Sequence, residues 1–384
     1  MKKRISSRVL SCLLVLTLIF GLVVPASAQS SNQASLSFQE MEGISAERIN
    51  NAPEKMTNET VYAPDQIVRV SIVMEKESTI EAGFSTTDIA QNDDAMSYRN
   101  ELKAEQKAMT AKIEAAIGSK LDVQWNLTLA ANIISANVAY GDMETIAAVP
   151  GVKDVFVETQ YEPCVVEQEE TADPNTATSG LMIGSNVAWA AGYTGAGSKI
   201  AVVDTGLDLD HQSFDASAFD YALSQLDGTV DLMDTEDIAK VLDQLNAKDR
   251  TPSLTAENLY RTTKVPYGYN YIDKTYSVID HDSDSQGEHG SHVEGIAAAN
   301  RFIPNGDGTF SNALEAVGVQ GVAPDAQIVV MKVFGMGGGA YDSDYMAAIE
   351  DAIILGCDSV NLSLGSVNPG FSRNTTYQNI LDSF

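Results

Sequence analysis

Short apolar segments alternate with helix-like segments through the second half of this 384-residue chain, and no other feature constrains its fold as strongly. The runs 199–203, 327–334 and 359–364 are rich in Val, Ile and Leu, and a helix-like segment at 342–355 separates the last two. Strands that alternate with helices favour a parallel sheet with right-handed crossovers and helices on both faces. The sequence therefore predicts the α/β class, with a doubly wound, mostly parallel sheet.

Two side chains suited to proton transfer lie near this predicted sheet. Asp204 ends the first apolar run, at the carboxyl end of a strand, where open α/β sheets bind their ligands. His289 lies between Gly287 and Gly290 at the start of a small, apolar run; such glycines permit close packing, and a histidine fixed at a helix start can act as a base. Taken alone, Asp204 is more typical of a turn or cap. The pair formed by His289 and His292 is, taken alone, more typical of a structural or weak metal site.

Four short motifs lie in one order between about residues 195 and 366. They are Val203-Asp204-Thr205-Gly206-Leu207-Asp208, His289-Gly290-Ser291-His292-Val293, Gly321-Val322-Ala323-Pro324 and Asn361-Leu362-Ser363-Leu364-Gly365. With these motifs the chain resembles the subtilases, the subtilisin-like serine proteases. The tyrosine-rich stretch 266–271 and the long approach to His289 are similar to the cell-envelope proteinase branch of that family.

The resemblance implies an Asp-His-Ser triad that hydrolyses peptide bonds. Asp204 would orient His289 and stabilise its imidazolium, and His289 would take the proton of a serine nucleophile and later give it to the leaving amine. The resemblance also implies two backbone edges that clamp an extended polypeptide substrate by strand addition. The residues of these edges would be Gly337, Gly338 and Gly339 on one side and Ser363, Leu364 and Gly365 on the other.

The family's nucleophile motif, Gly-Thr-Ser-Met-Ala, does not occur before Phe384. We therefore expect an incomplete sheet and the N-terminal part of a longer protease, inactive by itself, because losing the nucleophile and the oxyanion donor removes nearly all rate enhancement. Two other classes stay open: a non-catalytic chaperone or inhibitor, and a metal-dependent hydrolase that uses Asp204, His289 and His292. The three-residue histidine spacing differs from the four-residue spacing of helical zinc proteases.

The N-terminal 161 residues indicate export and then a small domain. Residues 1–28 have the basic start, apolar core and small-residue cleavage site of a secretory signal peptide, and a polar, flexible lead-in covers 29–64. The protein is thus expected to be secreted or extracellular at the cell surface, without a membrane span in this portion. Residues 65–161 follow the β-α-β-β-α-β order of the ferredoxin-like α+β motif.

A small α+β domain between a signal peptide and a subtilase-like domain resembles the family's inhibitory propeptide. The resemblance implies that the protease binds its own propeptide in cis, with the tail at about 159–170 lying in the active-site cleft. A generic α+β adaptor is the alternative. Residues 162–180 are polar and acidic and predict a cleavable linker, after which the N-terminal part of the catalytic domain covers 181–384.

A net charge of −29, from 53 acidic and 24 basic residues, disfavours binding to nucleic acid and to anionic membranes. Residues 216–265 lengthen the connection between the two catalytic motifs; we interpret them as a surface insertion near the cleft rim, with a helix at 235–247.

These motifs require no cofactor, although a structural calcium ion stays open. Asp280, Asp282 and Asp284 alternate as in some calcium loops, but a solvated acidic turn is favoured, and Ser213 occupies the position of a calcium-binding aspartate in the family. Glu294 replaces a residue that is small in the family, and a buried carboxylate there would need a partner or a raised pKa.

Overall fold

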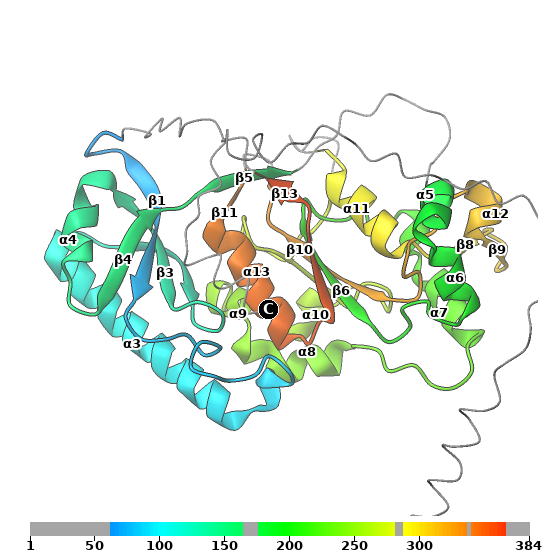
Figure 1. Cartoon of the computed structure of the whole chain (residues 1–384), viewed down its shortest axis with the longest axis horizontal. Helices are drawn as coiled ribbons and strands as arrows, with labels where there is room; N and C mark the ends of the chain where they lie inside the picture. Colours follow the sequence, from blue (N-terminus) through cyan, green and yellow to red (C-terminus); the bar gives the residue numbers. More distant parts are fainter. Residues whose placement is uncertain (1–61, 164–175, 281–286, 336–338, 366–384) are drawn as a thin grey trace, which may run out of the picture. The chain divides into compact units, whose positions relative to one another are not determined.

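A computed structural model describes residues 62–163, 176–280, 287–335 and 339–365 of the chain (Figure 1). At its centre is a four-stranded parallel sheet with the strand order β12-β6-β10-β7. Its strands are β6 (Lys199–Asp204), β7 (Tyr267–Asn270), β10 (Gln327–Lys332) and β12 (Ser359–Leu362). Strand β6 ends at Asp204, which is paired in register with Lys332 of β10.

Helices cover both faces of this sheet (Figure 1). Because side chains alternate along a strand, Ala201 and Val203 pack in the cluster that contains α13 (Asp342–Ile354), whereas Val202 packs in the cluster that contains α11 (His289–Ala298). The doubly wound parallel sheet predicted from the order of apolar segments is therefore confirmed.

Shorter elements connect these strands and helices. They are α5 (Thr176–Ile183), α6 (Ser185–Ala190), η3 (Gln212–Phe214), α7 (Ala216–Ser224), α8 (Thr235–Val241), η4 (Leu242–Gln244), α9 (Asn246–Arg250), α10 (Ala256–Leu259), β8 (Phe302–Pro304), β9 (Phe310–Asn312), α12 (Ala313–Val317), β11 (Ala340–Tyr341) and β13 (Leu364–Gly365). No helix in the described part of the chain is both long enough and apolar enough to cross a membrane.

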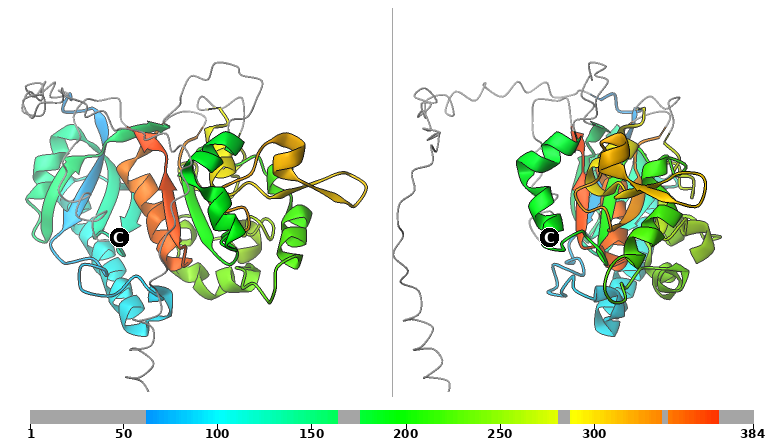
Figure 2. Two further views of the ribbon diagram at one scale, coloured as in Figure 1. Left: turned by 45° about the vertical axis from the view of Figure 1, so that its right-hand side comes forward. Right: turned by 90° about the vertical axis from the view of Figure 1, so that its right-hand side faces the viewer.

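Residues 65–163 form a domain with a second, antiparallel sheet of the order β2-β3-β1-β4. The elements are β1 (Ile67–Met74), η1 (Ile89–Gln91), α3 (Asp93–Ile117), β2 (Asp122–Leu127), β3 (Ile133–Ala139), η2 (Tyr140–Asp142), α4 (Met143–Ala147), β4 (Val152–Val157) and β5 (Gln160–Pro163). This is the predicted β-α-β-β-α-β order with one added strand, and α3, cyan in Figure 2, runs along the sheet. Asn92 caps the start of α3, and Gly118, with a φ of 71°, ends it.

The predicted helix at 235–247 is wrong in its extent. The chain leaves helical geometry at Val241 and again at Leu245, so that α8, η4 and α9 replace a single helix. The break aims the backbone N–H groups of Asn246 and Ala247 at the Asp351 carboxylate, at 2.6 and 3.0 Å. Leu245 and Ala247 are fully buried in the main core, so this part of the insertion does not lie on the surface.

Candidate functional site

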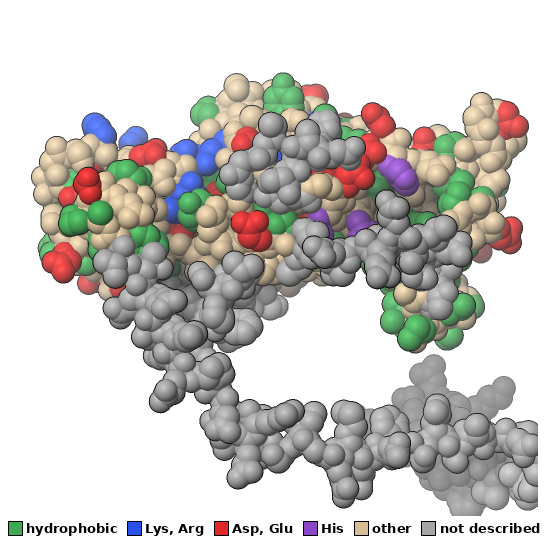
Figure 3. All heavy atoms as spheres, turned by 90° about the horizontal axis from the view of Figure 1, so that it is seen from above, with side chains coloured by type: hydrophobic (Ala, Val, Ile, Leu, Met, Phe, Trp, Pro, Cys, Tyr) green, Lys and Arg blue, Asp and Glu red, His purple; other side chains and the backbone are tan. Residues whose placement is uncertain are grey.

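Asp204 and His289 meet where β6 ends and α11 begins. The Asp204 Oδ1 atom lies 2.7 Å from His289 Nδ1, and the same oxygen accepts a hydrogen bond from the Thr205 N–H at 2.7 Å. The aspartate side chain is 1% exposed and the imidazole 12% exposed, so the pair is held in a largely dry environment that opens toward solvent at the histidine. Histidine side chains are visible on the face seen in Figure 3. A buried carboxylate on Nδ1 can fix the imidazole orientation and stabilise an imidazolium.

Two glycines allow this approach of helix and strand. Gly206 has a φ of +116°, and a Cβ at this position would overlap the Val278 carbonyl oxygen. A Cβ at Gly290 would overlap the carbonyl oxygen of Gly206. The Gly290 N–H donates to Thr205 Oγ1 at 2.7 Å. The close packing expected from the glycines around His289 thus has a specific cause, which is backbone contact between the two turns.

Asp280 is buried, so the prediction that it belongs to a solvated acidic turn is wrong. Its side chain accepts hydrogen bonds from the Ser291 N–H at 3.0 Å and the Ser291 hydroxyl at 3.1 Å. The Ser291 Oγ atom in turn accepts from the Asp208 N–H at 2.8 Å, which ties the first turn of α11 to the loop after β6. Burial raises the pKa of Asp280.

No group of three or more His, Cys, Asp or Glu side chains in the described ranges could hold a metal ion. Asp282 and Asp284, the other two aspartates of the alternating series, lie outside the described residues. Ser213, at the position of the family's calcium-binding aspartate, is buried in η3.

Glu294 of α11 is fully buried, and within the described residues neither carboxylate oxygen has a hydrogen-bond partner. Burial raises its pKa well above the usual value, and the charges of Asp204 and Asp280 raise it further. The side chain therefore meets the requirement for a raised pKa.

The sequence interpretation missed Lys332, which lies next to Asp204 in the sheet. Its Nζ atom donates to the Thr205 carbonyl oxygen, and the residue is only 4% exposed. A lysine that directly follows the apolar run Ile328–Met331 was a usable signal, since buried lysines are rare without a partner.

A three-stranded sheet has the order β11-β5-β13, and its strand β13 follows β12, whose Leu362 pairs with Val203. Strand β5 is the middle strand and pairs antiparallel with both neighbours: Tyr161 faces Ala340, and Pro163 faces Leu364. A Cβ at Gly339 would overlap the Tyr161 carbonyl oxygen, so only glycine allows the strands to approach this closely.

The six predicted substrate-binding residues are placed unevenly. Gly339 precedes β11, and Leu364 and Gly365 form β13, so these three line the two edges that hold β5. Ser363 lies between β12 and β13, with its hydroxyl donating to Asn361 Oδ1 at 2.9 Å. Gly337 and Gly338 lie outside the described residues.

A buried carboxylate joins β4 and β5 to the start of α13. Glu158 accepts hydrogen bonds from the Ser71 hydroxyl at 2.9 Å, the Ser343 hydroxyl at 2.8 Å and the Ser343 N–H at 3.2 Å. Burial raises the pKa of Glu158 to about 7, although the serine hydrogen bonds and Arg69 act in the opposite direction.

This pKa predicts that the stability contributed by Glu158 is lost as the pH rises from about 4 to about 7. The folded state holds a proton on Glu158 that the unfolded state, with a glutamate pKa of about 4.3, has already lost, so the folded form binds more protons in this window. In thermal denaturation, the midpoint temperature of Glu158→Gln should fall less between pH 5 and pH 8 than that of the wild type. The exposed Glu77→Gln, in the same domain, is the control and should leave it unchanged. Equal pH profiles for wild type and Glu158→Gln would contradict the assignment.

Comparison with known proteins identifies the class of protein that has this parallel sheet and this Asp204–His289 pair. Residues 195–383 match the model of the subtilase family, so this part of the chain is a subtilase-family domain.

Its relatives include large proteinases. The chain is 29% identical over 339 residues to the PI-type proteinase of Lactococcus lactis subsp. cremoris, covering 87% of this chain and 15% of that protein. It is 29% identical over 311 residues to the PII-type proteinase of Lacticaseibacillus paracasei, covering 80% of this chain and 14% of that protein. It is 25% identical over 321 residues to the minor extracellular protease Vpr of Bacillus subtilis (strain 168), covering 80% of this chain and 32% of that protein. The chain thus spans about one seventh of the length of the first two.

Proposed function

We propose that the chain belongs to a secreted serine endopeptidase in which Asp204 and His289 are two members of the triad. The observation that carries this proposal is the 2.7 Å contact between Asp204 Oδ1 and His289 Nδ1 at the carboxyl edge of the parallel sheet. With Nδ1 held by the carboxylate, His289 would use Nε2 to take the proton of a serine hydroxyl as the oxygen attacks the peptide carbonyl. The same nitrogen would then protonate the leaving amine, and Asp204 would stabilise the intermediate imidazolium.

The serine itself is proposed to lie in sequence that these 384 residues do not include, because no Gly-Thr-Ser-Met-Ala motif occurs in them. The 384 residues alone would then be inactive. Secretion is supported by the signal-like pattern at 1–28 and by similarity to a protease whose name describes it as extracellular.

We further propose that residues 65–161 are an inhibitory propeptide that binds in cis, with a cleavable linker at 162–180. The support is the position of β5, which begins at the end of this domain and occupies the middle of the β11-β5-β13 sheet. An extended peptide held between two edges by backbone hydrogen bonds is the binding mode that a protease substrate would use. In this proposal the propeptide tail and a substrate compete for Gly339, Leu364 and Gly365.

A serine-reactive fluorophosphonate probe tests the proposed activity. We expect the secreted gene product that includes the nucleophile motif to be labelled covalently after removal of residues 65–163, and to hydrolyse an unfolded protein substrate such as casein. Labelling should be weaker while the 65–163 domain is attached, because its strand β5 occupies the place between β11 and β13 where a substrate would bind. A product that hydrolyses casein without labelling, and that loses activity on chelation, would replace this proposal with the metal-dependent alternative.

A further inference from the structure

We propose that residues 244–250, the end of η4 and all of α9 within the insertion, are a recognition element that selects the chain's own 65–163 domain by its Arg99 side chain. This inference rests on the proposed function, in which the 65–163 domain is a separable propeptide. It gives the insertion a specific role in maturation.

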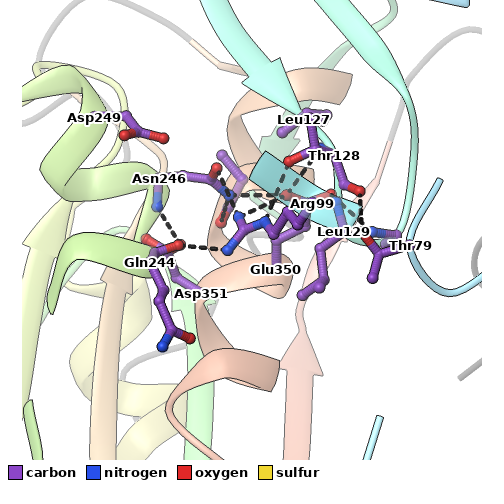
Figure 4. Close-up of polar contacts among 12 residues, drawn as sticks. Thr79, Arg99, Leu127, Thr128, Leu129, Gln244, Asn246, Asp249, Glu350 and Asp351 are labelled. Atoms are coloured by element: carbon purple, nitrogen blue, oxygen red, sulfur yellow. Dashed lines mark hydrogen bonds and ion pairs between the residues drawn. The ribbon is translucent and has the colours of Figure 1, made fainter. Parts of the chain in front are cut away.

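Arg99 crosses from α3 to the insertion (Figure 4). Its Nη1 donates to the Gln244 carbonyl oxygen at 2.5 Å, its Nη2 donates to Asn246 Oδ1 at 3.4 Å, and its Nη2 lies 3.6 Å from a Glu350 carboxylate oxygen. The residue is 1% exposed. Removing one partner of a buried charge leaves the other desolvated and unpaired, and such contacts discriminate strongly between right and wrong partners.

The recognition element is fixed in place by the protease half. The backbone N–H groups of Asn246 and Ala247 both donate to the Asp351 carboxylate of α13. The Asn246 side-chain amide donates to Glu350 at 3.0 Å and to the Ala347 carbonyl oxygen at 3.3 Å. Its oxygen is therefore already oriented toward Arg99, so that little ordering remains to be done when the 65–163 domain binds.

Other contacts from the same short element extend the surface. Lys103 of α3 pairs with Asp249 at 2.5 Å, and the Gln244 side-chain amide donates to the Ala90 carbonyl oxygen at 3.1 Å. The Arg250 guanidinium lies 5.9 Å from the ring centroid of Trp125. The element thus contacts α3, the η1 segment and β2 of the 65–163 domain.

The 65–163 domain is held by contacts to its backbone and by contacts to its side chains, and only the side-chain contacts depend directly on its sequence. Glu350 accepts hydrogen bonds from the backbone N–H groups of Leu129 and Ala130, both at 2.8 Å. Any sequence that forms the same turn can supply those donors. Arg99 is recognised through its side chain, so the 244–250 element adds a sequence-dependent contact to those that Asp344 of α13 makes with Arg69 and Trp125.

Release of the 65–163 domain from the intact chain tests this inference without requiring activity. A specific protease site is inserted into the 164–175 segment, the chain is cut there, and dissociation is followed by size exclusion and by the emission of Trp125, whose indole N–H donates to Asp344 at 2.7 Å. We expect Asn246→Ala and Arg99→Met each to accelerate release at least tenfold. The double variant should release no more than about threefold faster than Arg99→Met alone, because the two side chains act through one contact.

Matched variants of two exposed aspartates complete the experiment. Asp249→Asn should accelerate release about two- to fivefold, whereas Asp243→Asn, the same change six residues earlier in η4, should have no effect. The inference would be overturned if Asn246→Ala and Arg99→Met both released the domain at the wild-type rate. It would also be overturned if the rate increase in the double variant equalled the product of the two single increases. If the domain binds as described but does not reduce fluorophosphonate labelling of the active gene product, the propeptide role is lost while the recognition role survives.

Discussion

Replacing His289 with alanine is expected to abolish peptide hydrolysis and self-cleavage in the gene product that carries the nucleophile. The imidazole is the proposed base, and the contact of its Nδ1 atom with Asp204 fixes its position in the site. Loss of the corresponding histidine in a complete triad reduces kcat by roughly 10⁶-fold, because the nucleophile and its base act as a unit. Steady-state hydrolysis of a peptide substrate and the size of the secreted product measure the two effects.

His292→Ala is the matched control on the same helix. His292 is exposed, three residues beyond His289, so its removal should leave kcat/KM within about threefold of wild type. A metal-dependent mechanism that used both histidines would make the two variants equally inactive. Normal maturation of His289→Ala would remove Asp204 and His289 from the catalytic assignment.

Gly290→Ala is expected to separate the same two side chains without deleting either. The added methyl group would overlap the backbone of Gly206, and the Gly290 N–H would lose its geometry toward Thr205 Oγ1. Overpacking of this kind costs about 1–3 kcal/mol of unfolding free energy, and a displacement of about 1 Å between reacting groups can cost about 100-fold in rate. Urea denaturation and kcat/KM of the active gene product measure both quantities.

Gly295→Ala provides the comparison, because a Cβ at this position meets no atom within 4 Å. Alanine is favoured over glycine in a helix interior by about 1 kcal/mol, so this variant should be as stable as wild type or more so, with unchanged activity. If both glycine variants behave alike, helix propensity rather than backbone contact controls the site.

The central part of the site could be predicted because its signals are local. An apolar run that ends in Asp204 and a glycine-flanked His289 specify a strand end and a helix start, and the motif order then predicted that they meet. The resemblance implied two edges that clamp a substrate and a propeptide tail in the cleft, and the structure pairs β5 with strands that adjoin Gly339 and contain Leu364.

The parts that could not be predicted depend on partners distant in sequence. The helix at 235–247 breaks because Asp351, about 100 residues later, binds the N–H groups of Asn246 and Ala247. Asp280 is buried because Ser291 supplies two donors to it, and three alternating aspartates in sequence give no sign of that. Local pattern predicts which residues can cap or bind, but tertiary packing decides which of them do so.

Helix α13 has a consequence for the order in which the chain acquires structure. It carries Asp342, Asp344, Glu350 and Asp351 without a single basic residue, and the two acidic residues near its C-terminal end oppose the helix dipole. The cation and the amides that neutralise this unfavourable charge come from residues 99, 128–131 and 246–247, which leave the ribosome more than 100 residues earlier. The helix is therefore built to form against a template that is already present when it is synthesised.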